Sequence, residues 1–164
     1  MPFAGSHLWS LRQIVGDRLL LVPGAQVLLI DDQGRVLLQR ETGYGRWCLP
    51  GGSCEEGQSF AAAAAAELRE ETGLEVEEDA LTPFACLSDP EVHILLYPNG
   101  DRVHSFAMCF EARDWRGGLR PEPGEVEELG FFDLGELPEP LNPPTAVVLA
   151  LHAAYLRTGR FQAR

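Results

Sequence analysis

The stretch that decides the fold is PGGSCEEGQSFAAAAAAELREETGL, residues 50–74. It opens with Gly51 and Gly52, which can take backbone conformations closed to other residues. Ser59 is placed to cap a helix, because its hydroxyl can accept a hydrogen bond from a free backbone N–H group. Six alanines follow, and alanine has the highest helix propensity. Gly73 supplies a left-handed stop, so the stretch predicts a loop, a helix of about 14 residues and a sharp end.

Three glutamates share one face of this predicted helix. At about 100° per residue, Glu67, Glu70 and Glu71 fall within one arc of roughly 100°. Their like charges repel at i,i+3 and i,i+4 spacing, and the helix dipole disfavours anions in the last turns. A solvated acidic face is one explanation. The other is a hard divalent cation such as Mg²⁺, which binds carboxylate and carbonyl oxygens and would turn the repulsion into attraction.

The same stretch resembles the Nudix box, G-x5-E-x7-R-E-U-x-E-E-x-G-U, in which U is a bulky aliphatic residue. The matching positions are Gly52, Glu67, Leu68, Glu70, Glu71, Gly73 and Leu74. Two positions depart from the pattern, because Gln58 stands where the box has its first glutamate and Ala66 where it has arginine. The resemblance implies a Nudix-type α/β/α sandwich with a mixed sheet. The two departures bear on activity rather than on fold.

Length and composition indicate one globular domain over residues 1–164. The chain is 45% hydrophobic, and no apolar run approaches the roughly 18 residues of a membrane span, so we expect no membrane partner. The N-terminal residues lack the basic start and continuous apolar stretch of a secretory signal, so the expected location is cytoplasmic, with four reduced cysteines. The net charge of −12 argues against binding of a nucleic acid polymer along its phosphate backbone.

Strand and helix signals flank the box on both sides. The residues before 17 are expected to form an edge strand or to pack loosely. The pattern predicts strands at residues 17–22, 25–30, 36–40, 81–87, 92–97, 102–110 and 131–134. We expect the strand at 36–40 to pair antiparallel with the one at 25–30, and a turn at 98–101 to close a hairpin.

Two helices complete the expected fold. Phe60, Ala64 and Leu68 are expected to form the buried stripe of the box helix. Asn142 is expected to cap a last helix, which ends at Gly159. Strands on both sides of one helix, followed by a final helix, indicate an α/β sandwich, in agreement with the resemblance. Exposed strand edges such as that of the hairpin can pair, which allows a homodimer.

The resemblance also implies a chemistry. In Nudix hydrolases the box holds Mg²⁺ or Mn²⁺ against a pyrophosphate, and water cleaves a nucleoside diphosphate linked to another group. By position, Glu70 and Glu71 would be metal ligands, the Gly51 carbonyl a further ligand, and Glu67 a ligand or base. Past the box the family often has a further ligand or base, for which we choose Glu125; a solvated acidic loop is the alternative. Glu67, Glu70 and Glu125 are therefore the catalytic candidates.

Three residues ahead of the box are candidates for substrate binding. Arg40, at the end of an LLQR strand, resembles the family's arginine near the phosphates, and a surface arginine is the alternative. Arg46 lies in the adjoining loop and, like Arg40, is placed to replace the arginine missing at position 66. Trp47 is able to stack on a base, although a core position is more usual for a tryptophan at this point of the chain.

Three functional hypotheses follow. The first is a metal-dependent pyrophosphohydrolase acting on an ADP-ribose-like or other nucleotide substrate. The second is a Nudix-fold nucleotide-binding or regulatory protein with impaired catalysis, because Gln58 and Ala66 remove a charge and a charged hydrogen bond. A loss of about 10- to 100-fold in metal affinity or activity is typical of such changes beside a metal. The third is an unrelated acidic interaction domain.

Overall fold

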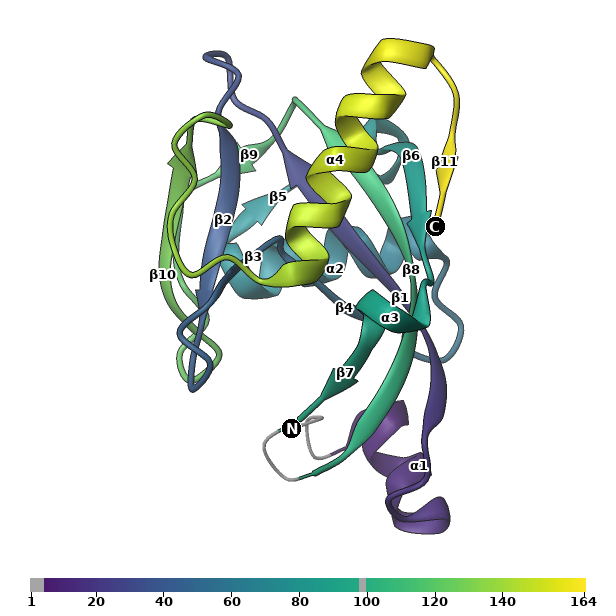
Figure 1. Ribbon diagram of the computed structural model, residues 1–164. Helices are drawn as coiled ribbons and strands as arrows, with labels where there is room; N and C mark the ends of the chain where they lie inside the picture. The colour runs from purple at the N-terminus through teal and green to yellow at the C-terminus, as the bar shows by residue number, and fades with distance from the viewer. Residues whose placement is uncertain (1–4, 98–99) are drawn as a thin grey trace.

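The computed structural model describes residues 5–97 and 100–164. Its helices are α1 (His7–Val15), α2 (Phe60–Thr72), α3 (Pro90–His93) and α4 (Pro143–Thr158), with a 3-10 turn η1 (Glu78–Ala80). Its strands are β1 (Leu20–Leu29), β2 (Val36–Glu41), β3 (Trp47–Cys48), β4 (Gly51–Ser53), β5 (Leu74–Glu75), β6 (Thr82–Leu87), β7 (Ile94–Leu96), β8 (Arg102–Ala112), β9 (Arg116–Gly117), β10 (Val126–Phe132) and β11 (Gln162–Ala163). Strands lie between α4 in front and α2 behind (Figure 1), which confirms the predicted α/β sandwich.

The sheets are mixed. The larger one has the order β11-β6-β8-β1-β4, with β7 paired to β8. Within it β1 and β8 run parallel from Leu20↔Val103 to Leu29↔Ala112, and β11 pairs parallel with β6. Strand β4 pairs antiparallel with β1, whereas β6 and β7 pair antiparallel with β8. A second sheet has the antiparallel order β10-β2-β3, and β5 pairs with β9. The long parallel pair β1–β8 therefore forms the centre to which the box loop is attached through β4.

The predicted strand pairing near the start of the chain was wrong. One strand, β1, runs through Pro23 and Gly24, where two strands were expected. A Cβ on Gly24 would lie 2.7 Å from the Gly52 carbonyl oxygen, so the glycine permits close approach of β4 rather than a turn. Strands β8 and β4 flank β1, so strand β2 pairs instead with β10 and β3. One isolated bridge, Ile30↔Val36, joins the residue after β1 to the start of β2.

The residues before 17 form a helix, not an edge strand. Ser6 caps α1 by accepting a hydrogen bond from the Trp9 N–H at 3.1 Å. Leu8 is buried against Val22 and Val103. The Arg12 guanidinium donates to three backbone carbonyls, two that follow α1 and that of Arg102 in β8. These contacts with distant strands fix α1 against the sheet, and the local sequence pattern does not reveal them.

Helix α2 has the predicted ends. The Ser59 hydroxyl accepts from the Ala62 N–H at 3.0 Å, and Gly73 ends the helix with φ 75°. Ala64 and Leu68 are fully buried, as predicted, but Phe60 is 38% exposed, which corrects the predicted stripe. Phe60 lies at the first helical position, beyond the cover of the sheet, where it lines a hollow next to α1.

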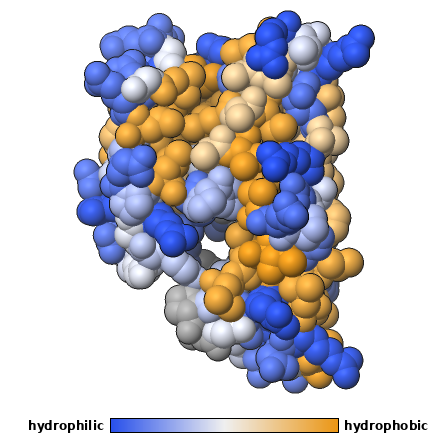
Figure 2. Space-filling view, viewed as in Figure 1, coloured by the Kyte–Doolittle hydropathy of each residue, from blue (hydrophilic) through white to orange (hydrophobic). Residues whose placement is uncertain are grey.

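Two apolar cores lie on opposite faces of the strands. The α2 side centres on Val27, Leu29, Leu37, Ala63, Ala64 and Leu68. The α4 side centres on Leu28, Val36, Leu38, Phe84, Leu87 and Val148. Consecutive residues of β1 and β2 alternate between these cores, as expected for strands covered on both faces. Figure 2 shows apolar surface around α4 and hydrophilic residues toward the edge near β10.

The remaining predictions hold with shifted bounds. Strands β6 and β8 are confirmed, whereas the strand expected from residue 92 begins at Ile94 because α3 takes the residues before it. Residues 98 and 99 of the expected turn lie outside the described residues. Pro143 begins α4 after Asn142, whose side chain makes no cap hydrogen bond, and Gly159 follows with φ 64°. The four cysteines are free thiols. No helix among the described residues is long and apolar enough to cross a membrane.

Candidate functional site

The glycine pair and the acidic face of α2 are in direct contact. The Gly51 N–H donates a hydrogen bond to Glu71 Oε2 at 2.8 Å. A Cβ on Gly52 would lie 2.4 Å from Glu67 Oε1, and one on Gly51 would lie 2.4 Å from the Ala25 carbonyl oxygen. Both positions therefore need glycine, Gly51 for packing against β1 and Gly52 to admit the Glu67 carboxylate. Strand β4 and helix α2 are held together at this point.

Two of the three box glutamates are withdrawn from solvent. Burial, together with Glu70, Glu125 and Glu55, raises the pKa of Glu67 to about 7. Burial and the neighbouring Glu67 also raise the pKa of Glu71 well above its ordinary value, although the hydrogen bond from the Gly51 N–H and the nearby Gln39 amide oppose the shift. Within residues 5–97 and 100–164, neither carboxylate forms an ion pair with an arginine or histidine. Their negative charges are therefore uncompensated by protein cations.

Glu70 and Glu125 lie nearer the solvent. The Glu70 side chain is 62% exposed and meets Arg69 Nη2 at 3.3 Å. Glu125 is half-buried in the loop before β10, where its carbonyl accepts from the Thr42 N–H at 2.8 Å. Burial, with Glu122 and Glu70 nearby, raises the pKa of Glu125. The structure thus brings Glu125 close enough to the acidic face to interact with it electrostatically.

The donor set suits a hard divalent cation. Carboxylate and carbonyl oxygens are the ligands that Mg²⁺ takes, and an ion there would replace mutual repulsion of Glu67 and Glu71 by attraction. In the described part of the chain, no three Asp, Glu, His or Cys side chains already converge at metal-ligand distances. Carboxylates that repel one another are expected to point apart, so their side chains must rotate to share one ion.

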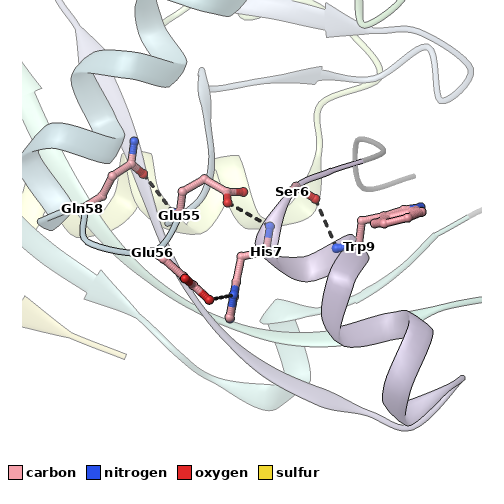
Figure 3. Close-up of polar contacts among 6 residues, drawn as sticks. All are labelled: Ser6, His7, Trp9, Glu55, Glu56 and Gln58. Carbon is pink, nitrogen blue, oxygen red and sulfur yellow. Dashed lines mark hydrogen bonds and ion pairs between the residues drawn. The ribbon is translucent and has the colours of Figure 1, made fainter.

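Gln58 is used inside the box loop. Its Oε1 accepts a hydrogen bond from the Glu55 N–H at 2.9 Å, and the side chain is exposed. The carboxylates beside it face α1: Glu55 Oε2 accepts from the His7 N–H at 2.8 Å, and Glu56 Oε1 lies 2.9 Å from His7 Nδ1 (Figure 3). The first turn of α1 is therefore attached to the box loop. The sequence prediction missed this contact because it joins segments almost fifty residues apart.

The arginine and tryptophan candidates lie apart from the buried glutamates. Arg40 pairs with Glu128 at 3.0 Å and Glu127 at 3.5 Å, and its guanidinium lies 5.9 Å from the centre of the Trp47 ring. Arg46 is exposed in the loop after β2. Trp47 is 6% exposed and packs edge-on against Phe132, as the alternative interpretation of the sequence expects. No arginine takes the place left by Ala66 among the described residues.

One buried residue beside the site was missed. Gln39 in β2 is 2% exposed, and its side chain lies near enough to Glu71 to oppose the rise in the pKa of that carboxylate. The signal was present in the sequence as a single amide within the apolar run VLLQ, at a position that strand pairing buries. A polar side chain in such a run is informative because it needs a partner in the core.

Comparison with models of protein families identifies the family of this chain. The NUDIX domain model matches residues 20–152. The chain belongs to the NUDIX family. A relative described as an RNA pyrophosphohydrolase, from Sphingopyxis alaskensis, is 31% identical over 138 residues, which cover 77% of this chain and 87% of that protein. The resemblance inferred from the box is therefore confirmed over most of the sequence.

Solved structures agree with the NUDIX assignment. A MutT NUDIX hydrolase from Burkholderia pseudomallei is 28% identical, with a TM-score of 0.66, and the match covers 79% of this chain and 96% of that one. An ADP-ribose pyrophosphatase from Streptococcus suis is 27% identical, with a TM-score of 0.61, and the match covers 87% and 97%. These matches support the prediction of a hydrolase that acts on pyrophosphate bonds.

Proposed function

We propose that this NUDIX protein is a divalent-metal-dependent pyrophosphohydrolase that cleaves a nucleoside diphosphate linked to another group. The observation that carries the proposal is the pair of partly buried carboxylates, Glu67 and Glu71, packed against the glycine loop without a cation partner among the described residues. Buried charges are ordinarily paired or coordinate a metal. The family membership and the oxygen donors of the site make Mg²⁺ or Mn²⁺ the expected partner.

The proposal gives each residue a role. Glu70, Glu71 and the Gly51 carbonyl would hold the ion, with Glu67 as a further ligand or as the base. A bound ion supplies charge neutralisation on the phosphoryl oxygens and lowers the pKa of a bound water. With its pKa near 7, Glu67 is suited to accept a proton from the attacking water at neutral pH, and Glu125 is the second candidate for this step.

Arg40 and Arg46 would bind the phosphate groups of the substrate. Arg40 is already paired with Glu127 and Glu128, so a phosphate group has to displace these carboxylates. The exchange is favourable for a bidentate guanidinium–phosphate contact, which is stronger than an exposed ion pair. Trp47 contributes to this site by packing beneath the Arg40 guanidinium rather than by stacking on a base.

A small nucleotide fits the charge of the chain better than an RNA strand. The two relatives named for their reactions act, by those names, on RNA and on ADP-ribose. Their shared chemistry is a pyrophosphate linkage, and the net charge of −12 disfavours contact with a long phosphate backbone. The proposal places the enzyme in the cytoplasm, in keeping with its four free cysteines.

A substrate panel tests the proposal. Purified protein would be incubated with ADP-ribose, other nucleoside diphosphate derivatives, nucleoside triphosphates and a 5′-triphosphorylated RNA oligonucleotide, each with Mg²⁺, Mn²⁺ or EDTA. We expect metal-dependent cleavage of at least one small nucleotide, lost in Glu70→Gln and Glu71→Gln. Folded protein that turns over none of them would remove the proposal, and preference for the RNA would correct the substrate class.

A catalytically impaired binding or regulatory protein is the second candidate. The observation that favours it is Gln58, whose amide is engaged with the Glu55 backbone, together with the lack of an arginine at position 66. In that case the protein would bind a nucleotide without consuming it. Calorimetry with the same panel separates the candidates, because binding without turnover supports the second.

A further inference from the structure

The chain between β9 and β10 crosses the C-terminal end of α2, and we call residues 118–125 the crossing segment. Within it the Arg120 N–H donates a hydrogen bond to the Thr72 carbonyl at 2.7 Å. The Glu122 N–H donates to the Glu71 carbonyl at 3.2 Å. Both carbonyls belong to the last turn of α2, where backbone acceptors have no partner within the helix. Main-chain atoms therefore hold the crossing segment on the box helix.

Glu125 is the last residue of the crossing segment, and its backbone is held from two sides. Its N–H donates to the Glu122 carbonyl at 3.2 Å, and its own carbonyl accepts from the Thr42 N–H at 2.8 Å. The two carboxylates that follow in β10 pair with Arg40 instead. The backbone therefore fixes Glu125 between the box helix and the loop after β2.

A close backbone contact attaches the chain just before the crossing segment. Strand β9 pairs antiparallel with β5 (Figure 1), with Gly117 opposite Leu74. A Cβ on Gly117 would lie 2.6 Å from the Gly73 carbonyl oxygen, and the φ of Gly117 is +97°. A Cβ on the neighbouring Gly118 would meet no atom of the described residues within 4 Å. The structure therefore requires glycine at position 117 and has room for a side chain at position 118.

A glycine needed only for a turn would show the positive φ without such a contact. Gly117 has both, and the residue that it contacts is Gly73, which ends α2 with φ 75°. The two glycines thus bring the end of the box helix against the start of the crossing segment. Because the hydrogen bonds of Arg120 and Glu122 to α2 follow directly along the chain, a shift at position 117 is expected to displace Glu125.

We propose that Gly117 is a positioning residue for Glu125. Its contact with Gly73 attaches the crossing segment to α2, and the segment in turn holds the Glu125 carboxylate at the acidic face. This inference rests on the proposed function, because it takes Glu125 as the group that accepts a proton from the attacking water. Gly117 acts through the backbone and contacts neither substrate nor metal in this account.

Steady-state kinetics of Gly117→Ala and Gly117→Asn test the inference on the substrate found by the panel. We expect kcat to fall by about 10- to 100-fold, because a displacement of about 1 Å can cost a rate factor of this size. We expect KM, and the Mn²⁺ dissociation constant measured by electron paramagnetic resonance, to stay unchanged, because Gly51 and the ligands on α2 lie outside the crossing segment. Asparagine is included because it tolerates positive φ better than alanine, so misfolding of Gly117→Ala does not decide the result.

Gly118→Ala is the matched control, because it adds the same methyl group one residue further along, where there is room for it. It is expected to keep the wild-type kcat. Hydrogen exchange reads the attachment of the segment without relying on activity. The Arg120 and Glu122 amide protons, which bind the carbonyls of α2, should exchange faster in both Gly117 variants and at the wild-type rate in Gly118→Ala.

A double-mutant cycle shows whether Gly117 acts through Glu125. In a Glu125→Gln background, Gly117→Asn should cause no further loss of kcat, because the group that it positions is already disabled. Equal losses in both backgrounds, wild-type kcat in the folded Gly117 variants, or wild-type kcat in Glu125→Gln would overturn the inference and leave the proposed function standing. Absence of metal-dependent turnover by the wild type would overturn both.

Discussion

The two faces of the sheet bury carboxylates in opposite ways. On the α4 face, Glu111 of β8 is paired with the buried His152 of α4 and with Arg113 at 2.7 Å. Burial opposes ionisation of Glu111, but the hydrogen bonds from His152 and Arg113 outweigh it and lower its pKa. On the α2 face, Glu67 and Glu71 have raised pKa values and no cation partner among the described residues.

The difference shows how the protein accommodates a carboxylate that has a structural role. Glu111 has its charge balanced within the protein, as buried charges usually have. The α2 face instead gathers further carboxylates, Glu70 and Glu125, around the buried pair. We expect a bound cation to stabilise this group of carboxylates, because their like charges repel one another. The following changes test that contrast, from the largest expected effect to the smallest.

Loss of a ligand charge should affect activity most. We expect Glu70→Gln and Glu71→Gln to lower kcat/KM by about 100-fold or more, since even residues that only support a metal ligand typically account for 10- to 100-fold. Steady-state kinetics on the substrate found by the panel measures this. Glu111→Gln is the control on the other face and should retain activity. Near-wild-type kinetics in both α2 variants would contradict the assigned roles.

The metal-free protein should lose stability as pH rises. Folded Glu67 stays protonated up to about pH 7, whereas in the unfolded chain it ionises near its ordinary value of 4.5. The folded state therefore binds more protons between these values, so its unfolding free energy falls across that window, by about 3 kcal/mol. Glu111, with its lowered pKa, contributes the opposite slope at lower pH.

Thermal melting at pH 5 and pH 8, with Mg²⁺ or with EDTA, measures this dependence. Mg²⁺ should raise the melting temperature more at pH 8, where Glu67 is ionised and can bind the ion. The same shift at both pH values would show that the buried carboxylate is not the group that binds Mg²⁺.

Neutral replacements of glutamates on the two faces of the sheet should change the melting temperature in opposite directions. Glu67→Gln is expected to raise the melting temperature of the metal-free protein at pH 8, because it removes an uncompensated buried charge. Glu111→Gln is expected to lower it by an amount equivalent to about 1 kcal/mol, because it weakens the hydrogen bonds to His152 and Arg113. Differential scanning calorimetry gives both values, and destabilisation by both variants would remove the contrast between the faces.

Restoring the box pattern should have the smallest effect. Gln58 already keeps an amide oxygen on the Glu55 N–H, and Glu67 and Glu71 are packed against the glycine loop without an arginine at position 66. We therefore expect Gln58→Glu with Ala66→Arg to change kcat/KM by less than about 10-fold. An inactive wild type that gains turnover only with both substitutions would favour the impaired binding or regulatory protein.

Local features of the chain were predictable, and distant contacts were not. The caps Ser59 and Gly73 and the acidic face of α2 follow from residues close together in sequence. The attachment of α1 to Glu55, the pairing of β2 with β10 and the burial of Gln39 between β10 and β3 each depend on distant segments. Sequence periodicity carries no information on such partners, so the glutamates of α2 were identified while these contacts were missed.

Anomalous diffraction from crystals soaked in Mn²⁺ tests the central claim most directly. The account predicts an anomalous peak beside the Gly51 carbonyl, with the Glu70 and Glu71 carboxylates rotated toward it and no peak beside Glu111. A fully soaked crystal without a peak at α2, or with Mn²⁺ bound only elsewhere, would contradict the account.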